Sequence, residues 1–372
     1  MALGGGERMV FNVAQSLSAQ GHAVDICYLE PTDTARIQQR LNLSLDGIRL
    51  HQLPNTLKAI QSATQLYDLF INMGHRPFVQ PQSKRSALVC FFPVGVDLSA
   101  RGRWRWRVGN ALRPFQSLLP KSVSARLNAL PSQVEISALQ SYQTILSITH
   151  YTQRWVQHYW QRKSDLLYPL VETMQPLPKE NYIISVGRFR AGHNNKKHEV
   201  LTQAFRELVD AGLQGWQLHL IGGLTDEPEH QRYFAELQAL ARQYPIHLHP
   251  NLPHAQLSKR AGQAKIYWHA TGYGEDLAHF PDRAEHFGIS TVEAMSAGCV
   301  PVVIDAGGQP EIVQNGNSGL LWRTLSELKT KTLQLIQQPE AWSHMSQQAQ
   351  QRSALFCDQE AFRKSVLATL CV

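Results

Sequence analysis

The sequence is poor in features that would cross-link the chain or anchor it in a membrane. Its five cysteines, Cys27, Cys90, Cys299, Cys357 and Cys371, are widely separated and form no C-x-x-C pair. This spacing indicates neither a disulfide framework nor a zinc site, and a reducing cytosol fits it best. No apolar run reaches the ~18 residues of a membrane span, and no charged segment followed by an apolar one marks a secretory leader. We therefore expect a cytoplasmic protein, at most peripheral to the cytoplasmic face of a membrane.

Metal-binding patterns are also lacking. The sequence has no Asp-x-Asp pair that would hold a divalent ion on a diphosphate, and no H-E-x-x-H motif. His247 and His249 alternate in a strand pattern, where packing in the core or against solvent is the usual explanation. The expectation is a protein with no metal site and no bound cofactor.

Composition permits two globular domains with an affinity for anions. The chain has 372 residues, of which 43% are hydrophobic and 17% charged, enough for about two domains that each bury a core. Lys and Arg number 36 against 29 Asp and Glu, a formal net charge of +7. This excess favours a phosphorylated substrate, a nucleic acid or an acidic lipid as partner, without choosing among them.

Hydrophobic patterns alternate between strand and helix in both halves of the chain, which predicts an α/β fold with parallel sheets. A proline cluster at Pro169, Pro176 and Pro178 interrupts the alternation and is typical of an interdomain linker. We predict an N-terminal, acceptor-side domain over 1–173, a C-terminal, donor-binding domain over 174–355, and a helix over 356–372 that packs back towards the first domain. Ligands of two such domains are expected in a cleft at the carboxyl ends of the sheets.

A glycine cluster, Gly4, Gly5 and Gly6, stands almost at the start of the chain. Glycine loops of this kind bring backbone N–H groups to an anion at a helix N-terminus and normally follow a strand. Only Met1, Ala2 and Leu3 precede this one. We favour a natural start upstream of Met1; the alternative is a domain whose sheet lacks its first strand.

The segment "RAEHFGISTVEAMSAGCVPVV" is the most informative. Glu285 and Glu293 flank a turn at Gly288, which allows close backbone approach. The N–H groups of Ile289, Ser290 and Thr291 at the predicted helix start would face an anion. Ser290 and Glu293 also have the spacing of a capping box, in which both satisfy helix N–H groups without any ligand.

This segment resembles the Glu-x7-Glu signature of glycosyltransferase family 4, which has the GT-B fold. The phrases "IISVGRF", "NKKHEVLTQAF", "LHLIGG", "GCVPVVIDAGGQPEIV" and "NGNSGLLW" follow in family order, and "GGGER" matches the first loop of the family. The resemblance implies two Rossmann-like domains that face each other across a cleft. It also implies a retaining, metal-independent transfer of a hexosyl group from a UDP- or GDP-sugar to a hydroxyl of a glycan, lipid-linked or small-molecule acceptor. A non-catalytic sugar-nucleotide-binding or partner protein of the same fold is the alternative.

The resemblance also implies residue roles. Arg188 and Lys197 match the cation pair that binds the distal phosphate and stabilises the charge left as the sugar departs, and Lys196 is placed to share that role. Glu293, expected within the first turn of the helix that follows Gly288, would accept hydrogen bonds from the ribose, and Glu285, on the preceding loop, would face the donor sugar. The other donor-binding candidates are Gly5, Gly6, Phe287, Gly288, Ile289, Ser290 and Thr291. A histidine of the first domain often touches the donor sugar in this family; His75 and His150 are candidates by position, and a solvent-facing loop histidine is the alternative for each.

The segment 101–126 is basic and contains two tryptophans in its core, "RGRWRWRVGNALRPF". No acidic residue occurs between Asp97 and Glu135. Aromatic and basic residues in this mixture suit an anionic membrane surface or an anionic acceptor. A solvated basic loop with its tryptophans packed on the domain explains it equally well. Single-stranded nucleic acid would suit it too, but leaves Glu285 and Glu293 unexplained, so no nucleic acid is expected.

Overall fold

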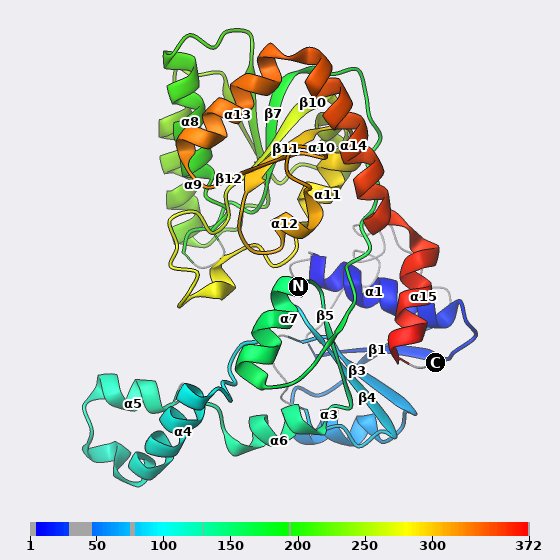
Figure 1. The fold of residues 1–372 in the computed structure, drawn as a ribbon. Helices are drawn as coiled ribbons and strands as arrows, with labels where there is room; N and C mark the ends of the chain where they lie inside the picture. The colour runs from blue at the N-terminus through cyan, green and yellow to red at the C-terminus, as the bar shows by residue number, and fades with distance from the viewer. Residues whose placement is uncertain (1–4, 30–46, 75–78, 129, 193–194, 371–372) are drawn as a thin grey trace. The chain divides into compact units, whose positions relative to one another are not determined.

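The computed structural model describes residues 5–29, 47–74, 79–128, 130–192 and 195–370. The chain divides into two units, Met1–Pro169 with Gln359–Val372, and Leu170–Asp358 (Figure 1). The division between Pro169 and Leu170 lies beside the proline cluster. The terminal segment belongs to the first unit.

The first unit contains helices and short parallel strands. They are α1 (Gly5–Ser18), β1 (Val24–Tyr28), β2 (Ile48–Gln52), α3 (Leu57–Thr64), β3 (Leu69–Asn72), β4 (Arg85–Cys90), α4 (Ala100–Leu112), η1 (Arg113–Leu118), α5 (Lys121–Asn128), α6 (Gln133–Ser141), β5 (Thr144–Ser147), α7 (His150–Trp155), η2 (Val156–Trp160), β6 (Asp165–Leu166) and α15 (Gln359–Leu370). Among the described residues these strands form two separate sheets, β1-β2 and β3-β4-β5-β6. Strand β4, central in the second sheet, contains the continuous apolar run "ALVC", because helices cover the faces of parallel sheets.

Helix α15 joins the first unit through a regular apolar stripe. Phe362, Val366 and Leu370 recur every four residues and are all buried. The helix packs against α1, whose Met9, Val13 and Leu17 have the same spacing and are buried as well. Residues four apart lie on one face of a helix, so each of the two helices presents a single apolar ridge.

The second unit repeats the alternation more regularly. Its elements are β7 (Glu180–Val186), α8 (His198–Asp210), β8 (Gln217–Gly222), α9 (Pro228–Ala241), β9 (Ile246–Pro250), α10 (His254–Gln263), β10 (Ala264–His269), η3 (Pro281–Arg283), α11 (Ile289–Ser296), β11 (Val300–Ile304), α12 (Gln309–Ile312), β12 (Leu320–Trp322), α13 (Leu325–Gln337) and α14 (Pro339–Cys357). The six strands are parallel and lie in the order β12-β11-β10-β7-β8-β9, with helices packed around the sheet (Figure 1).

The core of the second unit lies between this sheet and its helices. Leu201, Ala204, Phe205 and Leu208 form the apolar face of α8 at helical spacing, and each is at most 2% exposed. They belong to one cluster with Trp268 of β10 and other strand residues. The strands that carry the loops of this unit are therefore supported by a packed core, which is what a binding site on those loops requires.

One expectation from the sequence is corrected in the first unit. The basic segment is mostly helical: α4 and α5 cover much of it, with η1 between them. The alternative of a basic loop therefore does not describe it. Trp106 packs on the domain and donates its Nε1–H to the carbonyl of Pro131, 3.1 Å away, whereas Trp104 is 65% exposed.

Candidate functional site

The polar residues selected from the sequence gather at the carboxyl ends of two neighbouring strands of the second unit. From β7 the chain continues outward to β8 and β9, then returns to form β10 on the other side of β7. Strand order thus reverses between β7, which ends at Val186, and β10, which ends at His269. Ligands of open parallel sheets bind outside the strands at such a reversal point. The second unit has one binding edge defined by its topology.

Lys197 stands at this edge in an unusual backbone conformation. It is the residue before α8 and has φ 57°, in the left-handed region, which costs a non-glycine residue about 1–3 kcal/mol. Its N–H donates to Oδ1 of Asn195 at 2.6 Å. Its Nζ lies 2.7 Å from Oε1 of Glu275, and the side chain is only 18% exposed. The strained backbone keeps a cation beside the positive end of a helix.

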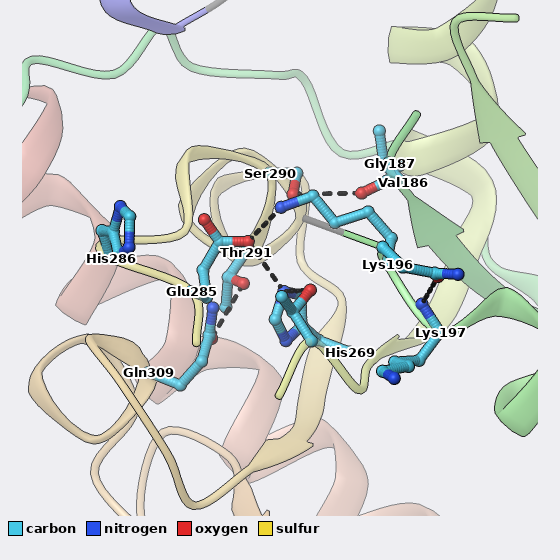
Figure 2. A network of polar contacts seen from close by, with 12 residues as sticks. Val186, Gly187, Lys196, Lys197, His269, Glu285, His286, Ser290, Thr291 and Gln309 are labelled. Carbon is cyan, nitrogen blue, oxygen red and sulfur yellow. Dashed lines mark hydrogen bonds and ion pairs between the residues drawn. The ribbon is translucent and has the colours of Figure 1, made fainter. Parts of the chain in front are cut away.

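Lys196 is held in the same region by a different carboxylate. Its Nζ lies 2.5 Å from Oε2 of Glu285, and both side chains are about one fifth exposed, 21% and 18% (Figure 2). The aliphatic part of Lys196 covers Gly187, where a Cβ would lie 2.5 Å from the lysine Cγ. Gly187 is thus required by close packing, and Lys196 reaches Glu285 over it.

Glu285 has a second partner from β10. Oε2 of Glu285 lies 3.1 Å from Nε2 of His269, which is also 3.1 Å from Oγ1 of Thr271 (Figure 2). Burial opposes ionisation of Glu285, but Lys196 and His269 outweigh it and hold the pKa of this carboxyl well below its usual 4.5. Burial also lowers the pKa of His269, so the imidazole is neutral at neutral pH. Glu285 is therefore an ionised carboxylate fixed by one cation and one neutral donor.

Helix α11 begins at Ile289 directly after Gly288, which has φ 120°. A Cβ at Gly288 would lie 2.3 Å from Nε2 of Gln309, so only glycine fits there. Oγ1 of Thr291 donates to Oε1 of Gln309 at 3.0 Å, and the Ser290 hydroxyl donates to the carbonyl of Val186 at 3.3 Å. The Ser290 contact thus ties the start of α11 to the end of β7, and the Thr291 contact ties it to the first residue of α12.

These contacts correct two expectations about this helix. The residue that caps the N-terminus of α11 is Gly288, and no side chain caps this end of the helix. The Ser290 hydroxyl donates to Val186 instead, so the capping box is not formed. The N–H of Thr291 donates to the carbonyl of Gly288 at 3.0 Å, which leaves Ile289 and Ser290 as the anion-facing N–H groups of the predicted three.

Glu293 was predicted in the first turn of α11, and that is wrong. The helix starts at Ile289 and carries no acidic residue in its first turn, so Glu293 lies one turn further along as its fifth residue. Its side chain is half-buried. A carboxylate at this position lies about one turn away from the helix N-terminus, which is the end that would face a phosphate.

Arg188 follows Gly187 at the end of β7 and is exposed. The loops after β7 and β8 touch: a Cβ at Gly222 would meet the carbonyl oxygen of Gly187. Among the residues that the structure describes, the guanidinium of Arg188 makes no ion pair, in contrast to both lysines. Phe287 is 3% exposed and packs against Phe356 at 5.6 Å between ring centroids, so its side chain belongs to the core.

The remaining candidates belong to the first unit. Gly5 and Gly6 form the first residues of α1, and their donor role stays a prediction. His150 opens α7, is exposed, and its Nδ1 lies 2.7 Å from Oε1 of Gln153. His75 lies outside the described residues.

Three residues of the site have no counterpart in the sequence prediction: His269, Glu275 and Gln309. His269 is the last residue of β10, in the apolar pattern "KIYWHA". Functional side chains collect at strand ends beside a reversal point, so its position carried a signal. Glu275 lies in an acidic, glycine-containing loop whose pattern indicates no contact. Gln309 follows Gly307 and Gly308, and only the folded chain brings it to Gly288.

Neither a metal site nor a membrane span is found in the part of the chain that the structure describes. No group of three His, Cys, Asp or Glu side chains there is placed to hold an ion. No helix within those ranges is both long and apolar enough to cross a bilayer.

Comparison with known proteins places the second unit in a family. Residues 173–352 match the family described as Glycosyl transferases group 1. This part of the chain is a glycosyltransferase domain of that group. Its limits enclose β7 to β12 and every site residue described above from Arg188 to Gln309.

Curated relatives match about half of this chain. A protein of Dictyostelium discoideum named GDP-Man:Man(3)GlcNAc(2)-PP-Dol alpha-1,2-mannosyltransferase is 25% identical over 191 residues, 48% of this chain and 35% of the relative. The protein of the same name from Xenopus tropicalis is 29% identical over 201 residues, 51% of this chain and 38% of the relative. The matches thus span little more than a third of these relatives.

Solved structures resemble the whole chain. HepE of Anabaena in complex with UDP and glucose has a TM-score of 0.68 at 13% identity, with 99% of this chain and 96% of that one covered. Sucrose-phosphate synthase of Thermosynechococcus elongatus has a TM-score of 0.66 at 17% identity, with 96% and 90% covered. At these identities the likeness establishes the fold. The α/β fold with parallel sheets is confirmed.

Proposed function

We propose that this chain is a retaining, metal-independent glycosyltransferase that moves a hexosyl group from a nucleotide sugar to a hydroxyl of a glycan, lipid-linked or small-molecule acceptor. The observation that carries the proposal is the collection of Arg188, Lys196, Lys197 and the start of α11 at the reversal point of a glycosyl transferases group 1 domain. Cations and helix N–H groups at one sheet edge are what a diphosphate needs.

The roles follow from charge and position. Arg188 and Lys197 bind the distal phosphate, and Lys196 helps to neutralise its negative charge. The N–H groups of Ile289 and Ser290 donate hydrogen bonds to the phosphate oxygens. Glu293 accepts from the ribose hydroxyls and Glu285 from the hydroxyls of the donor sugar. Because Lys196 and His269 keep Glu285 ionised, it acts as an acceptor of hydrogen bonds and orients the sugar without supplying a proton.

The transfer itself needs leaving-group stabilisation. The bond between the anomeric carbon and the phosphate oxygen breaks, the acceptor oxygen forms its bond on the same face, and the acceptor proton passes to the departing phosphate. Two unit charges of opposite sign ~4 Å apart attract each other with an energy of about 4 kcal/mol at an effective dielectric of 20. Two cations on the departing phosphate therefore replace a metal ion in stabilising its charge.

The donor that we propose to test first is GDP-mannose. The curated relatives carry GDP-Man in their names, whereas the HepE structure contains UDP and glucose. The curated relatives are 25% and 29% identical over 48% and 51% of this chain, whereas HepE is 13% identical over 99% of it. UDP-glucose is the comparison substrate.

The acceptor side is proposed to touch an anionic membrane surface through α4. Arg101, Trp104, Arg105 and Val108 have the spacing of one helix face, and all four are exposed. Basic residues near a membrane surface contribute about 1 kcal/mol each towards binding anionic lipid, and an exposed tryptophan suits the interface.

The test of the donor site is binding of GDP and UDP to single variants. Arg188→Ala and Glu293→Ala should each weaken the affinity of the preferred nucleotide by about tenfold or more, because each removes one charged hydrogen-bonding group, worth about 1.5–3 kcal/mol. Isothermal calorimetry on the full chain measures it. Arg190→Ala, from the same loop, is the matched control and should keep wild-type affinity.

Normal affinity in both variants would refute the site. Wild-type nucleotide binding without hydrolysis of, or transfer from, GDP-mannose or UDP-glucose would instead favour the non-catalytic alternative. Product analysis by mass spectrometry separates these outcomes.

A further inference from the structure

A cavity of about 500 Å³ lies within the first unit, lined by residues of α4, of α6 and of the segment at the end of η2. Its buried lining residues are apolar: Ile136, Leu139 and Trp160 are each at most 8% exposed. Cavities of about 300–1,000 Å³ with mostly apolar walls are typical of small-molecule sites. The floor of this cavity therefore suits a hydrocarbon group.

The cavity lies away from the edge of its sheet where a substrate is expected. Helix α6 ends shortly before β5 begins, and Trp160 and Arg162 lie shortly before β6. The guanidinium of Arg162 ties these two connections together, because it donates to the carbonyls of Leu139 at 3.2 Å and Tyr142 at 2.7 Å. These residues thus meet at the amino ends of parallel strands, whereas substrates of such sheets bind at the carboxyl ends.

The mouth of the cavity is basic. Arg103, Trp106 and Arg107 share one face of α4, at positions i, i+3 and i+4, and both arginines are exposed. Among the described residues that line the cavity, Arg162 adds a third cation and Asp97 is the one acid. The lining therefore has a net positive charge, which an anionic group would complement.

Trp160 provides a second indication of a ligand. Its side chain is 2% exposed, and its Nε1–H has no hydrogen-bond partner among the residues that the structure describes. A buried donor is rarely left without an acceptor. An ester or phosphate oxygen of a molecule in the cavity would satisfy this one. We therefore expect a ligand that carries oxygen acceptors as well as an apolar chain.

We propose that the cavity binds a hydrocarbon chain of an anionic phospholipid, with the lipid phosphate held by Arg103 and Arg107. The inference rests on the proposed function in its membrane contact, because the same helix carries Arg101, Trp104 and Arg105 on its exposed face. A lipid taken from that surface holds α4 on the membrane by a buried chain as well as by surface charge.

The experiment measures binding of n-decyl phosphate to the full chain by isothermal calorimetry, below the concentration at which micelles form. The wild type should bind decyl phosphate more tightly than inorganic phosphate, which lacks the chain, and more tightly than decyl maltoside, which lacks the charge. Gln140→Trp places a ring at an exposed position of the lining, so affinity for decyl phosphate should fall by about tenfold or more. Val134→Trp is the matched control, because it adds the same ring to α6 at a 58% exposed position outside the lining.

A second pair of variants tests the charge. Arg107→Gln should weaken decyl phosphate binding by about tenfold, because it removes one charged hydrogen-bonding group, and should leave decyl maltoside binding unchanged. Arg105→Gln, on the exposed face of the same helix, should keep wild-type affinity for decyl phosphate. Gln140→Trp should also bind phosphatidylserine-containing vesicles more weakly than Val134→Trp does.

Equal binding of inorganic phosphate or decyl maltoside by the wild type overturns the inference. Unchanged binding of decyl phosphate by Gln140→Trp or Arg107→Gln overturns it as well. If the vesicles still bind in either case, the proposed membrane contact of α4 stands. A wild type that binds neither decyl phosphate nor the vesicles overturns both.

Discussion

At the scale of single residues, the site depends on two backbone conformations that most side chains avoid. Gly288 has φ 120° and Lys197 has φ 57°. Glycine removes the penalty at 288, whereas Lys197 carries it, and both stand directly before a helix that faces the binding edge. Strain of this kind persists where the surrounding structure enforces it, which is common at functional sites.

Gly288→Ala should therefore destabilise the second unit. The new Cβ would meet Nε2 of Gln309 at 2.3 Å, and the positive φ adds about 1–3 kcal/mol of strain. Urea unfolding followed by tryptophan fluorescence measures the change in the free energy of unfolding. Gly223→Ala is the matched control, because its Cβ would meet its nearest atoms at 3.8 Å and 3.9 Å. Equal stability of the two variants would contradict the argument.

The sequence predicts which residues belong to the site better than it predicts which of them contact each other. Glu285, Lys196 and Lys197 were selected as site residues because each belongs to a family motif. That Lys196 contacts Glu285, 89 residues away, and Lys197 contacts Glu275, 78 residues away, was not predicted. Such pairs depend on the order of the strands, which no local pattern encodes.

At the scale of elements, α4 shows how one helix divides its faces. Gly102 and Gly109 are buried, where they allow close contact with Asp97 and with Leu130, and Trp106 lies on the same side at helical spacing. The opposite face carries Arg101, Trp104 and Arg105, all exposed. The sequence predicted the basic character of this segment but not its helices, because the segment has few apolar residues to mark a helical period and its buried face consists mainly of glycine.

The exposed face of α4 should control binding to anionic vesicles. A variant with Arg101→Gln, Trp104→Ala and Arg105→Gln loses two charges and one interfacial ring, so vesicle affinity should fall by about 2 kcal/mol or more, some thirtyfold. Cosedimentation with phosphatidylserine-containing and purely phosphatidylcholine vesicles measures it. The control Arg232→Gln with Arg242→Gln removes the same charge from exposed positions of the second unit and should keep wild-type binding. Equal recovery of the wild type in the supernatant with both vesicles would exclude the membrane proposal.

At the scale of the whole molecule, buried histidines of the second unit set its response to acid. Burial lowers the pKa of His198 to about 4, of His219 to about 3 and of His286 to about 4, from a usual 6.5. The folded state thus keeps these imidazoles neutral at a pH where the unfolded chain protonates them. Their contribution to stability is complete above pH 6.5 and is lost as the pH falls towards 4.

We therefore expect the free energy of unfolding to fall as the pH is lowered from 6.5 to 4.5, by up to about 1.4 kcal/mol per pH unit for each such histidine. Urea unfolding at a series of pH values measures the slope. His219→Asn should make the slope shallower, since one of these protonation steps is removed. His254→Asn, at an exposed position of the same unit, should leave it unchanged. A flat wild-type profile over this range would contradict the prediction.

By itself the sequence determined the alternation of strands and helices and the motifs of the glycosyltransferase domain, because these depend on residues close together in the chain. Only the tertiary structure decided that strand order reverses between β7 and β10, and that the loop after β10 brings Glu275 to Lys197. The reason is physical: side-chain periodicity records which face of an element is buried, whereas the neighbours of that element are chosen by packing of the complete chain.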